Sequence, residues 1–510
     1  MHKWLAAVAL TVATGVAAAT SAEIRPNALL DHIKFLASDE MRGRADGSPE
    51  LERAAEYIAQ QFKAEGLQPG GDHGDWFQPF ELQAGLVIGR NNSLTLVYRG
   101  RPIALTLGTS YYPLSAPANE DVSIPSAKIE HLPVVFAGYG LSVPSVGYDD
   151  YSAIDVRDKA VLIFSHEPQE HDGNSRFNGA RPVRESTLRA KASLARSKGA
   201  RVLLVVSDPT HRADEANYKL FAEDPEADDE GIPVLRIRRD EVRSLISAWN
   251  LEAYARAIDQ DLTPRSKPLG GVTVDYEEHL AKNRRTVRNV VGVLTGADPA
   301  RAKEAIVIGA HYDHIGIGGH LSVTPERTGE IHNGADDNAS GTSSVLEIAR
   351  AAMSERSRFP RTLVFVAFAG EERGLLGSQH YVRDPAVPIE NTIAMLNLDM
   401  VGRSRGAVDV SGLENSPALD ADFQAASRAV ANLEIRREGP GAGRSDDASF
   451  LDRAIPAINF FTGFHPDYHR PGDDWDKIDA PGTARVATLA LEFAARIAQR
   501  QTRPDFVRSR

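Results

Sequence analysis

The chain contains no cysteine among its 510 residues, so it can form neither disulfide bonds nor thiolate metal sites. A cysteine nucleophile is excluded for the same reason. Any metal ion must therefore be bound by imidazole and carboxylate groups, which 15 His and 70 Asp and Glu residues supply. The lack of cysteine is compatible with an oxidising compartment but does not require one.

An excess of positive charge is also missing. The formal net charge is -12, which argues against nucleic acid or an anionic membrane surface as the main partner. Charged residues make up 25% and hydrophobic residues 42% of the chain, as in ordinary globular proteins. The length exceeds that of one ordinary domain, so we expect two or three domains.

Long apolar runs are absent except near the N-terminus. A short basic start, His2-Lys3, precedes an almost wholly apolar stretch from Trp4 to Ala19. Small residues follow up to Ala22, so residues 1–22 are predicted to be a secretory signal peptide cleaved near Ala22. The apolar stretch is short for a transmembrane span, and no cysteine is available for a lipid anchor. We therefore expect export to the periplasm or the medium, without a membrane anchor.

Strand and helix patterns alternate in the second half of the chain. Apolar runs predict buried strands at residues 305–309, 362–369, 392–398 and 455–461. Helical periodicity occurs over residues 340–353, 374–382 and 484–500. This alternation predicts an α/β fold with a mixed, largely parallel sheet sandwiched by helices.

A second α/β pattern, over residues 134–249, has little that looks catalytic and could form a small independent α/β module.

The most informative motif is an apolar run, 365–369, that ends at Gly370 and is followed by Glu371 and Glu372. In an open α/β sheet, ligands bind at the carboxyl ends of the strands. One carboxylate of such a pair can hold a metal while its neighbour acts as a base on metal-bound water. Taken alone, the pair could equally be the solvated first turn of a helix.

Four other acid or histidine motifs follow strand ends or stand late in the chain. They are His311-Tyr312-Asp313, Gly334-Ala335-Asp336-Asp337-Asn338-Ala339-Ser340-Gly341, Leu396-Asn397-Leu398-Asp399-Met400 and Asp467-Tyr468-His469-Arg470-Pro471-Gly472-Asp473-Asp474. Each is weak alone, because acid pairs also cap helices and short motifs recur by chance. Together, two histidines and several carboxylates suit zinc in a hydrolytic site. Two metals bridged by one carboxylate need about this many ligands.

The order of these motifs resembles that of the co-catalytic zinc aminopeptidases of metallopeptidase family twenty-eight. The resemblance extends over nearly the whole mature chain and includes the segment Asn289-Val290-Val291-Gly292. Two further segments, Phe136-Ala137-Gly138-Tyr139-Gly140 and Lys198-Gly199-Ala200, are similar to the protease-associated domain that many members carry as an insertion. The resemblance implies a zinc exopeptidase fold, two zinc ions and the removal of N-terminal residues from peptides. It also implies that residues 131–270 are an inserted domain, between an N-terminal part of the catalytic domain at 23–130 and its main part at 271–510.

The resemblance also implies a role for individual residues as metal ligands. His311 and Asp399 would bind one zinc ion, and Glu372 and His469 the other. Asp336 would bridge the two ions, and a cis peptide bond would join it to the following residue, Asp337.

By the same resemblance, Glu371 is the general acid and base of the reaction. Asp313 would hydrogen-bond His311 and fix its tautomer. Four other histidines match no ligand position and are expected to be loop residues. They are His314, His320, His332 and His465.

One position departs from the family pattern. Relatives commonly carry His or Tyr where this chain has Asp447, close to the substrate. One hypothesis is that Asp447 binds the α-amine or a basic first side chain of the peptide, because an unpaired carboxylate attracts positive charge. The alternative is that Asp447 pairs with Arg444, or another nearby arginine, and only shapes its loop.

Three other functions are alternatives on the same fold. A glutaminyl cyclase-like acyltransferase would go with one zinc ion and fewer ligands. A non-enzymatic receptor would lack ligands or the base, and neither loss is visible. A carboxypeptidase or dipeptidase is not excluded, because pocket residues that the sequence does not place determine which end of the peptide binds.

Overall fold

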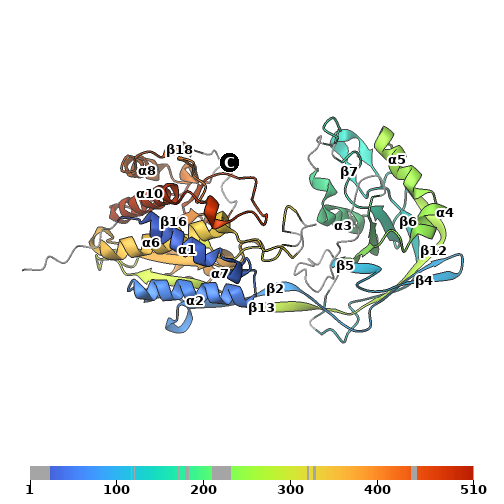
Figure 1. Cartoon of the computed structure of the whole chain (residues 1–510), viewed down its shortest axis with the longest axis horizontal. Helices are drawn as coiled ribbons and strands as arrows, with labels where there is room; N and C mark the ends of the chain where they lie inside the picture. The colour runs from blue at the N-terminus through green and yellow to red at the C-terminus, as the bar shows by residue number, and fades with distance from the viewer. Residues whose placement is uncertain are drawn as a thin grey trace, which may run out of the picture.

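The computed structural model describes residues 23–115, 118–119, 121–170, 172–177, 183–208, 231–318, 321–324, 329–437 and 445–508. The predicted signal peptide lies outside these residues. Two lobes, each built on its own sheet, are joined by a long antiparallel ribbon of β2 (Phe77–Ile88) and β13 (Leu280–Leu294) (Figure 1). Within the described ranges, no helix has both the length and the apolar character needed to cross a bilayer.

The first lobe contains a sheet of nine strands in the order β1-β13-β15-β14-β16-β19-β17-β18, with β2 also paired to β13. The strands not yet defined are β1 (Gln68–Pro69), β14 (Ala305–His311), β15 (Thr362–Phe368), β16 (Thr392–Leu398), β17 (Ala407–Ser411), β18 (Glu434–Arg437) and β19 (Ala457–Phe461). Strands β15, β14, β16 and β19 are parallel to one another. Strands β13 and β17 join this group antiparallel. The predicted mixed, largely parallel sheet is confirmed.

Helices cover both faces of this sheet, as strands that are buried along their whole length require. Every residue of β14, β15 and β16 is buried. Alternate side chains point to opposite faces, so Ile306 and Ile308 pack in one core and Val307 in another. The first core includes α1 (Pro26–Leu36), α2 (Pro49–Ala64), α6 (Gly341–Ser354), α8 (Asp420–Ser427) and α10 (Ala480–Gln499). The second includes residues of α7 (Leu376–Tyr381) and α9 (Asp447–Leu451).

Local signals explain where two of the long helices begin. Ser48 precedes α2, and its hydroxyl accepts a hydrogen bond from the Leu51 amide at 3.1 Å. Asp479 precedes α10 and accepts from the Gly482 amide at 3.0 Å. Each helix also has proline in its first turn, where the missing amide proton removes no helical hydrogen bond.

The second lobe has a sheet of eight strands in the order β4-β3-β12-β6-β9-β10-β11-β5. Its strands are β3 (Ser93–Tyr98), β4 (Arg101–Leu105), β5 (Tyr111–Ser115), β6 (Ala127–Phe136), β9 (Ala160–Phe164), β10 (Val202–Val206), β11 (Val234–Ile237) and β12 (Lys267–Glu278). Its helices are α3 (Leu188–Ser197), α4 (Arg243–Ala248) and α5 (Leu251–Asp261). A small hairpin of β7 (Ser142–Val143) and β8 (Tyr148–Asp149) lies beside it.

The expected boundaries of the insertion at 131 and 270 do not coincide with this sheet. Strands β3, β4 and β5 come before residue 131, and β12 continues to Glu278. The hairpin of β3 and β4 pairs with β12 across a long stretch of sequence. The second sheet therefore includes residues that we had placed in the catalytic domain, because their partner strand lies far along the chain.

Candidate metal centre

The carboxyl ends of the parallel strands bring two groups of possible metal ligands together. One group consists of His311, Glu371 and Asp399, and the other of His314, Asp337, Glu372 and His469. Within each group the ligand atoms lie within 4.8 Å of one another. Of the five ligands expected, four belong to these groups. Asp336 does not, and Asp337, His314 and the expected base Glu371 are present in addition.

The strand ends position the first group. His311 is the last residue of β14, and Asp399 follows β16. Gly370 follows β15 closely and has a φ of 72°, a conformation that residues with a Cβ rarely adopt. The chain turns there, and Glu371 and Glu372 lie at the same edge of the sheet.

His311 has one ring nitrogen directed at the acids and one at the backbone. Its Nε2 lies 3.3 Å from Asp337 Oδ1, 3.4 Å from Asp399 Oδ1 and 4.0 Å from Glu371 Oε2. Its Nδ1 lies 3.2 Å from the main-chain carbonyl of Asp313. When Nδ1 donates its proton to that carbonyl, Nε2 offers its lone pair to a metal.

Asp313 acts differently from what we expected. Its carboxylate Oδ1 is 3.7 Å from His311 Nδ1, so the histidine bonds instead to the carbonyl of the same residue. The two carboxylate oxygens accept from the amides of Glu371 and Glu372, each at 3.2 Å. Asp313 therefore contacts the backbone of both strand ends and positions His311 and the acid pair relative to each other.

The carboxylate that faces both groups belongs to Asp337. Its Oδ1 is 3.3 Å from His311 Nε2, and its Oδ2 is 3.2 Å from His469 Nε2. Asp336 points elsewhere: Oδ1 accepts from the Gly402 amide at 2.6 Å, and Oδ2 lies 3.3 Å from His465 Nε2. The expectation that Asp336 lies between the two sites is therefore wrong, and Asp337 occupies that position.

The backbone turn at the acid pair explains this one-residue difference. Asp473 Oδ2 accepts from the amides of Asp336 and Asp337, at 2.9 Å and 3.0 Å. The Asn338 side chain donates to the Leu398 carbonyl at 3.0 Å and accepts from the Met400 amide at 3.2 Å. The cis peptide bond joins Asp337 to Asn338, so the bond that we expected between Asp336 and Asp337 is also misplaced by one residue.

His314 belongs to the second group, although we expected it to be a loop residue that matches no ligand position. Its Nδ1 lies 2.7 Å from Glu372 Oε1, and its ring meets that of His469 edge-on at 5.6 Å. Its side chain is fully buried, and Nε2 has no hydrogen-bond partner among the described residues. Its position one residue after Asp313, at the same strand end as His311, is the sequence signal that could have found it.

The other histidines lie outside both groups or outside the described residues. His332 hydrogen-bonds Ser322 through Nε2 at 2.9 Å, and His465 faces Asp336 and Asp473. His320 is not among the residues that the structure describes.

The electrostatics of the site suit a bound cation. Burial alone would lower the pKa of His469, but the carboxylates of Glu372 and Asp337 raise it to about 11. Burial likewise opposes a charge on His311, yet the acids Glu371 and Asp399 raise its pKa well above the usual value. The acids thus favour a positive charge beside them in a buried site. Imidazole nitrogens and carboxylate oxygens without thiolate are a donor set that fits zinc.

Sequence comparison agrees with this geometry. Residues 289–494, which include both ligand groups, match the family model "Peptidase family M28". These residues form a peptidase family M28 domain. The M28 domain begins within β13 and ends within α10, so it comprises the parallel core of the first lobe.

Relatives of the M28 domain include proteins that are named as aminopeptidases. A "Probable leucine aminopeptidase" of Arthroderma benhamiae is 28% identical over 208 residues, 39% of this chain and 56% of the relative. "Aminopeptidase YwaD" of Bacillus subtilis is 27% identical over 240 residues, 45% of this chain and 48% of the relative. The chain spans about half the length of the curated relatives that it matches.

Solved structures share the fold of both lobes. The aminopeptidase from Aneurinibacillus sp. strain AM-1 has a TM-score of 0.56 at 23% identity, covering 95% of this chain and 96% of that one. BSAP, a zinc aminopeptidase from Bacillus subtilis, has a TM-score of 0.55 at 20% identity, and the match covers 92% of this chain and 94% of that one. The fold of the M28 domain together with the second lobe is therefore shared with these proteins.

The M28 domain also places an acid near the first group that sequence reasoning missed. Asp446 is fully buried, and neither carboxylate oxygen has a hydrogen-bond partner among the described residues. Burial raises its pKa to about 7, and nearby His311 opposes that rise. Asp447, the residue that we had singled out, is also buried and accepts from the Ser445 amide at 3.2 Å. Arg444, its expected partner, lies outside the described residues.

Proposed function

We propose that the protein is a zinc-dependent aminopeptidase that removes N-terminal residues from peptides by a two-metal mechanism. The observation that carries this proposal is Asp337, because one buried carboxylate faces ligand groups on both sides. Two-metal sites recur in hydrolytic enzymes, aminopeptidases among them. The names of the relatives and the M28 match support the same activity.

Five side chains would hold the two ions. His311 and Asp399 would bind one, Glu372 and His469 the other, with Asp337 between them. Zinc ions held there would lower the pKa of a bound water and polarise the scissile carbonyl. That both groups are complete favours this assignment over a one-metal glutaminyl cyclase.

Glu371 is the residue best placed to move protons. Burial raises the pKa of its carboxyl well above the usual range, and the neighbouring acids Glu372 and Asp399 add to that rise. A carboxylate in this environment takes a proton from the attacking water, holds it and then passes it to the leaving amine. The hydrogen bonds from the Glu371 and Glu372 amides to Asp313 keep the acid pair in place.

An aromatic surface beside the second group supports a preference for apolar first residues. Tyr468 stacks on His469 with ring centroids 4.0 Å apart, and Phe464 meets Tyr468 edge-on at 4.9 Å. The rings of Phe461 and Phe464 also meet edge-on, with their centroids 5.2 Å apart, and Phe464 is 64% exposed to solvent. An apolar side chain bound here would cover aromatic surface that water now contacts.

Asp447 is buried and bonded to its own loop, which supports its role in shaping that loop over direct contact with a basic side chain.

We propose further that the second lobe is a protease-associated domain that restricts access to the active site. Its place between β2 and β13 supports an insertion. Among its described residues no cluster of possible metal ligands is found.

Two measurements together test the proposal: the metal content, and the end of the peptide from which residues are removed. Protein purified without added metal and then titrated with zinc should bind two ions per chain. It should hydrolyse aminoacyl anilides, with leucine and phenylalanine preferred over lysine, and leave N-blocked peptides intact. A stoichiometry that stays at one favours the cyclase. Hydrolysis of N-blocked peptides from their C-terminal end favours a carboxypeptidase.

A further inference from the structure

A buried arginine outside the M28 domain contacts the loops that carry the metal ligands. Arg44 is fully buried and is among the largest side chains with no exposure. Its guanidinium donates to four main-chain carbonyls. They are those of Leu36, Tyr312 at 2.9 Å, Asn333 at 2.8 Å and Gly334 at 3.0 Å.

The positions of these carbonyls connect Arg44 to both ligand groups. Tyr312 directly follows His311 at the end of β14. Asn333 and Gly334 directly precede the turn that carries Asp337. One rigid, planar guanidinium therefore spans the two loops whose side chains meet at 3.3 Å between His311 Nε2 and Asp337 Oδ1.

The backbone around Arg44 lies equally close to these loops. The Arg44 carbonyl accepts from the His314 amide at 3.2 Å, and the Gly43 carbonyl accepts from the Gly316 amide at 3.0 Å. Gly43 has a φ of 71°, and a Cβ there would lie 2.3 Å from the His332 carbonyl oxygen. Glycine permits both this conformation and this close approach.

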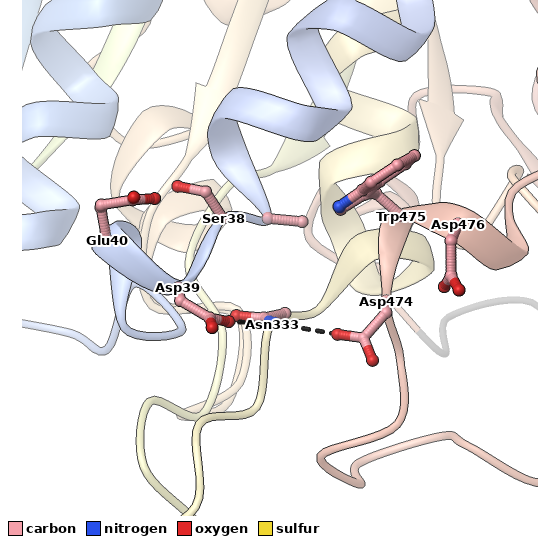
Figure 2. Close-up of a pocket in the computed structure, with 8 residues that line it drawn as sticks. Ser38, Asp39, Glu40, Asn333, Asp474, Trp475 and Asp476 are labelled. Carbon is pink, nitrogen blue, oxygen red and sulfur yellow. Dashed lines mark hydrogen bonds between the residues drawn. The ribbon is translucent and has the colours of Figure 1, made fainter.

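Two further contacts extend the connection. Asp46 Oδ2 lies 3.4 Å from Arg373 Nε, and Arg373 follows Glu372 directly. On the other side, Figure 2 shows the side chain of Asn333 between Asp39 and Asp474, to each of which its Nδ2 donates at 2.9 Å. The N-terminal segment thus contacts the loops of His311, Asp337 and Glu372, and Asn333 links it to the loop that carries His469.

The charge of Arg44 suits this place. Burial lowers its pKa to about 10, so the guanidinium stays protonated at neutral pH. The acids that oppose this lowering include Asp313, Asp337 and Glu372. The guanidinium thus places a positive charge behind these acids.

We propose that Arg44 is a positioning residue of the metal centre, which sets the spacing between the His311 loop and the Asp337 loop before metal binds. The proposal rests on the two-metal site of the proposed function. A preformed spacing means that binding zinc does not have to order the two loops. The loss of Arg44 should therefore weaken metal binding by more than its effect on folding explains.

The test compares Arg44→Lys with Arg42→Lys. Arg42 lies in the same loop, but its side chain is 56% exposed and its one described ion pair, with Glu50, is 4.0 Å long. Lysine keeps the charge in both variants but cannot reach four carbonyls in the fork geometry of a guanidinium. Zinc affinity is measured by competition with a chelator, and the melting temperature is measured on metal-free protein.

We expect Arg44→Lys to weaken zinc binding by roughly 10–100-fold, the range found when outer-shell partners of metal ligands are changed. Arg42→Lys should bind zinc like the wild type. Asp46→Asn, which weakens the contact with Arg373, should lower zinc affinity in the same direction but less. The folded Arg44→Lys protein should give a circular dichroism spectrum like that of the wild type.

Unchanged zinc affinity in folded Arg44→Lys would overturn the proposal. So would a failure of that variant to fold together with unchanged zinc affinity in Asp46→Asn, because Arg44 would then be a general determinant of the fold. These results are distinct from failure of the proposed function, which would appear as fewer than two zinc ions bound by the wild type.

Discussion

Exchanging the two adjacent aspartates one at a time tests the geometry of the centre most directly. Asp337→Asn removes a charge from the carboxylate that faces both His311 and His469, at 3.3 Å and 3.2 Å. Asp336→Asn is a matched control of identical chemistry. Its Oδ1 can still accept from the Gly402 amide, a contact of 2.6 Å.

Coulomb's law gives the magnitude. Two unit charges 4 Å apart interact by about 4 kcal/mol at an effective dielectric constant of about 20. A loss of about 4 kcal/mol corresponds to a factor of roughly 10³ in affinity. Asp337→Asn should therefore weaken zinc binding by roughly 10³-fold or more, and kcat/KM should fall with it. Asp336→Asn should still bind two zinc ions, with kcat/KM within about tenfold of the wild type and a lower melting temperature, because it alters a buried contact with His465.

The assay is zinc stoichiometry by elemental analysis after titration and dialysis, alongside kcat/KM on leucine anilide. Loss of zinc from Asp336→Asn, with zinc retained in Asp337→Asn, would refute the assignment and restore the role first expected for Asp336. Equal loss in both variants would mean that the turn, and not the carboxylate of Asp337, determines binding.

Three further outcomes are expected. Glu371→Gln should keep its zinc but lower kcat by roughly 10²–10⁴, whereas Glu372→Gln should lose zinc; equal zinc loss in the two would contradict this division of roles. His314→Phe, which removes the 2.7 Å contact with Glu372, should weaken zinc binding by roughly 10–100-fold, and unchanged affinity would show that His314 only fills space. Burial raises the pKa of Glu278 to about 8, so the folded state holds a proton that the unfolded chain releases above a pKa of about 4.5. Stability is therefore lost as pH rises between these two values, and Glu278→Gln should gain stability relative to the wild type, by up to a few kcal/mol, at pH 9 compared with pH 5. Urea unfolding at the two pH values measures this, and an equal difference at both would refute it.

The amino-acid sequence by itself determined the sheet of the first lobe and most of the candidate metal ligands at its edge. Apolar runs such as that of β15 are local signals, and Glu371, Glu372 and Asp399 stand directly beyond them. Parallel strands bring their carboxyl ends to one edge, so residues at several strand ends can be predicted to meet without knowledge of the packing.

The tertiary structure alone decided which of the two adjacent aspartates faces the site. Neighbouring residues in an irregular turn point in different directions, and contacts from distant segments determine those directions. Here Asp473 binds both amides of the turn, and the Leu398 carbonyl holds the side chain of the next residue, Asn338.

The same reason applies to the other features that sequence reasoning missed. His314 faces Glu372 across a separate loop, and β3 joins the second sheet through β12, a strand far along the chain. Arg44 contacts carbonyl groups, which every residue has, so no residue pattern could reveal its partners. Local patterns predict where a strand ends, but the direction of a side chain beyond that end depends on contacts that only the folded chain forms.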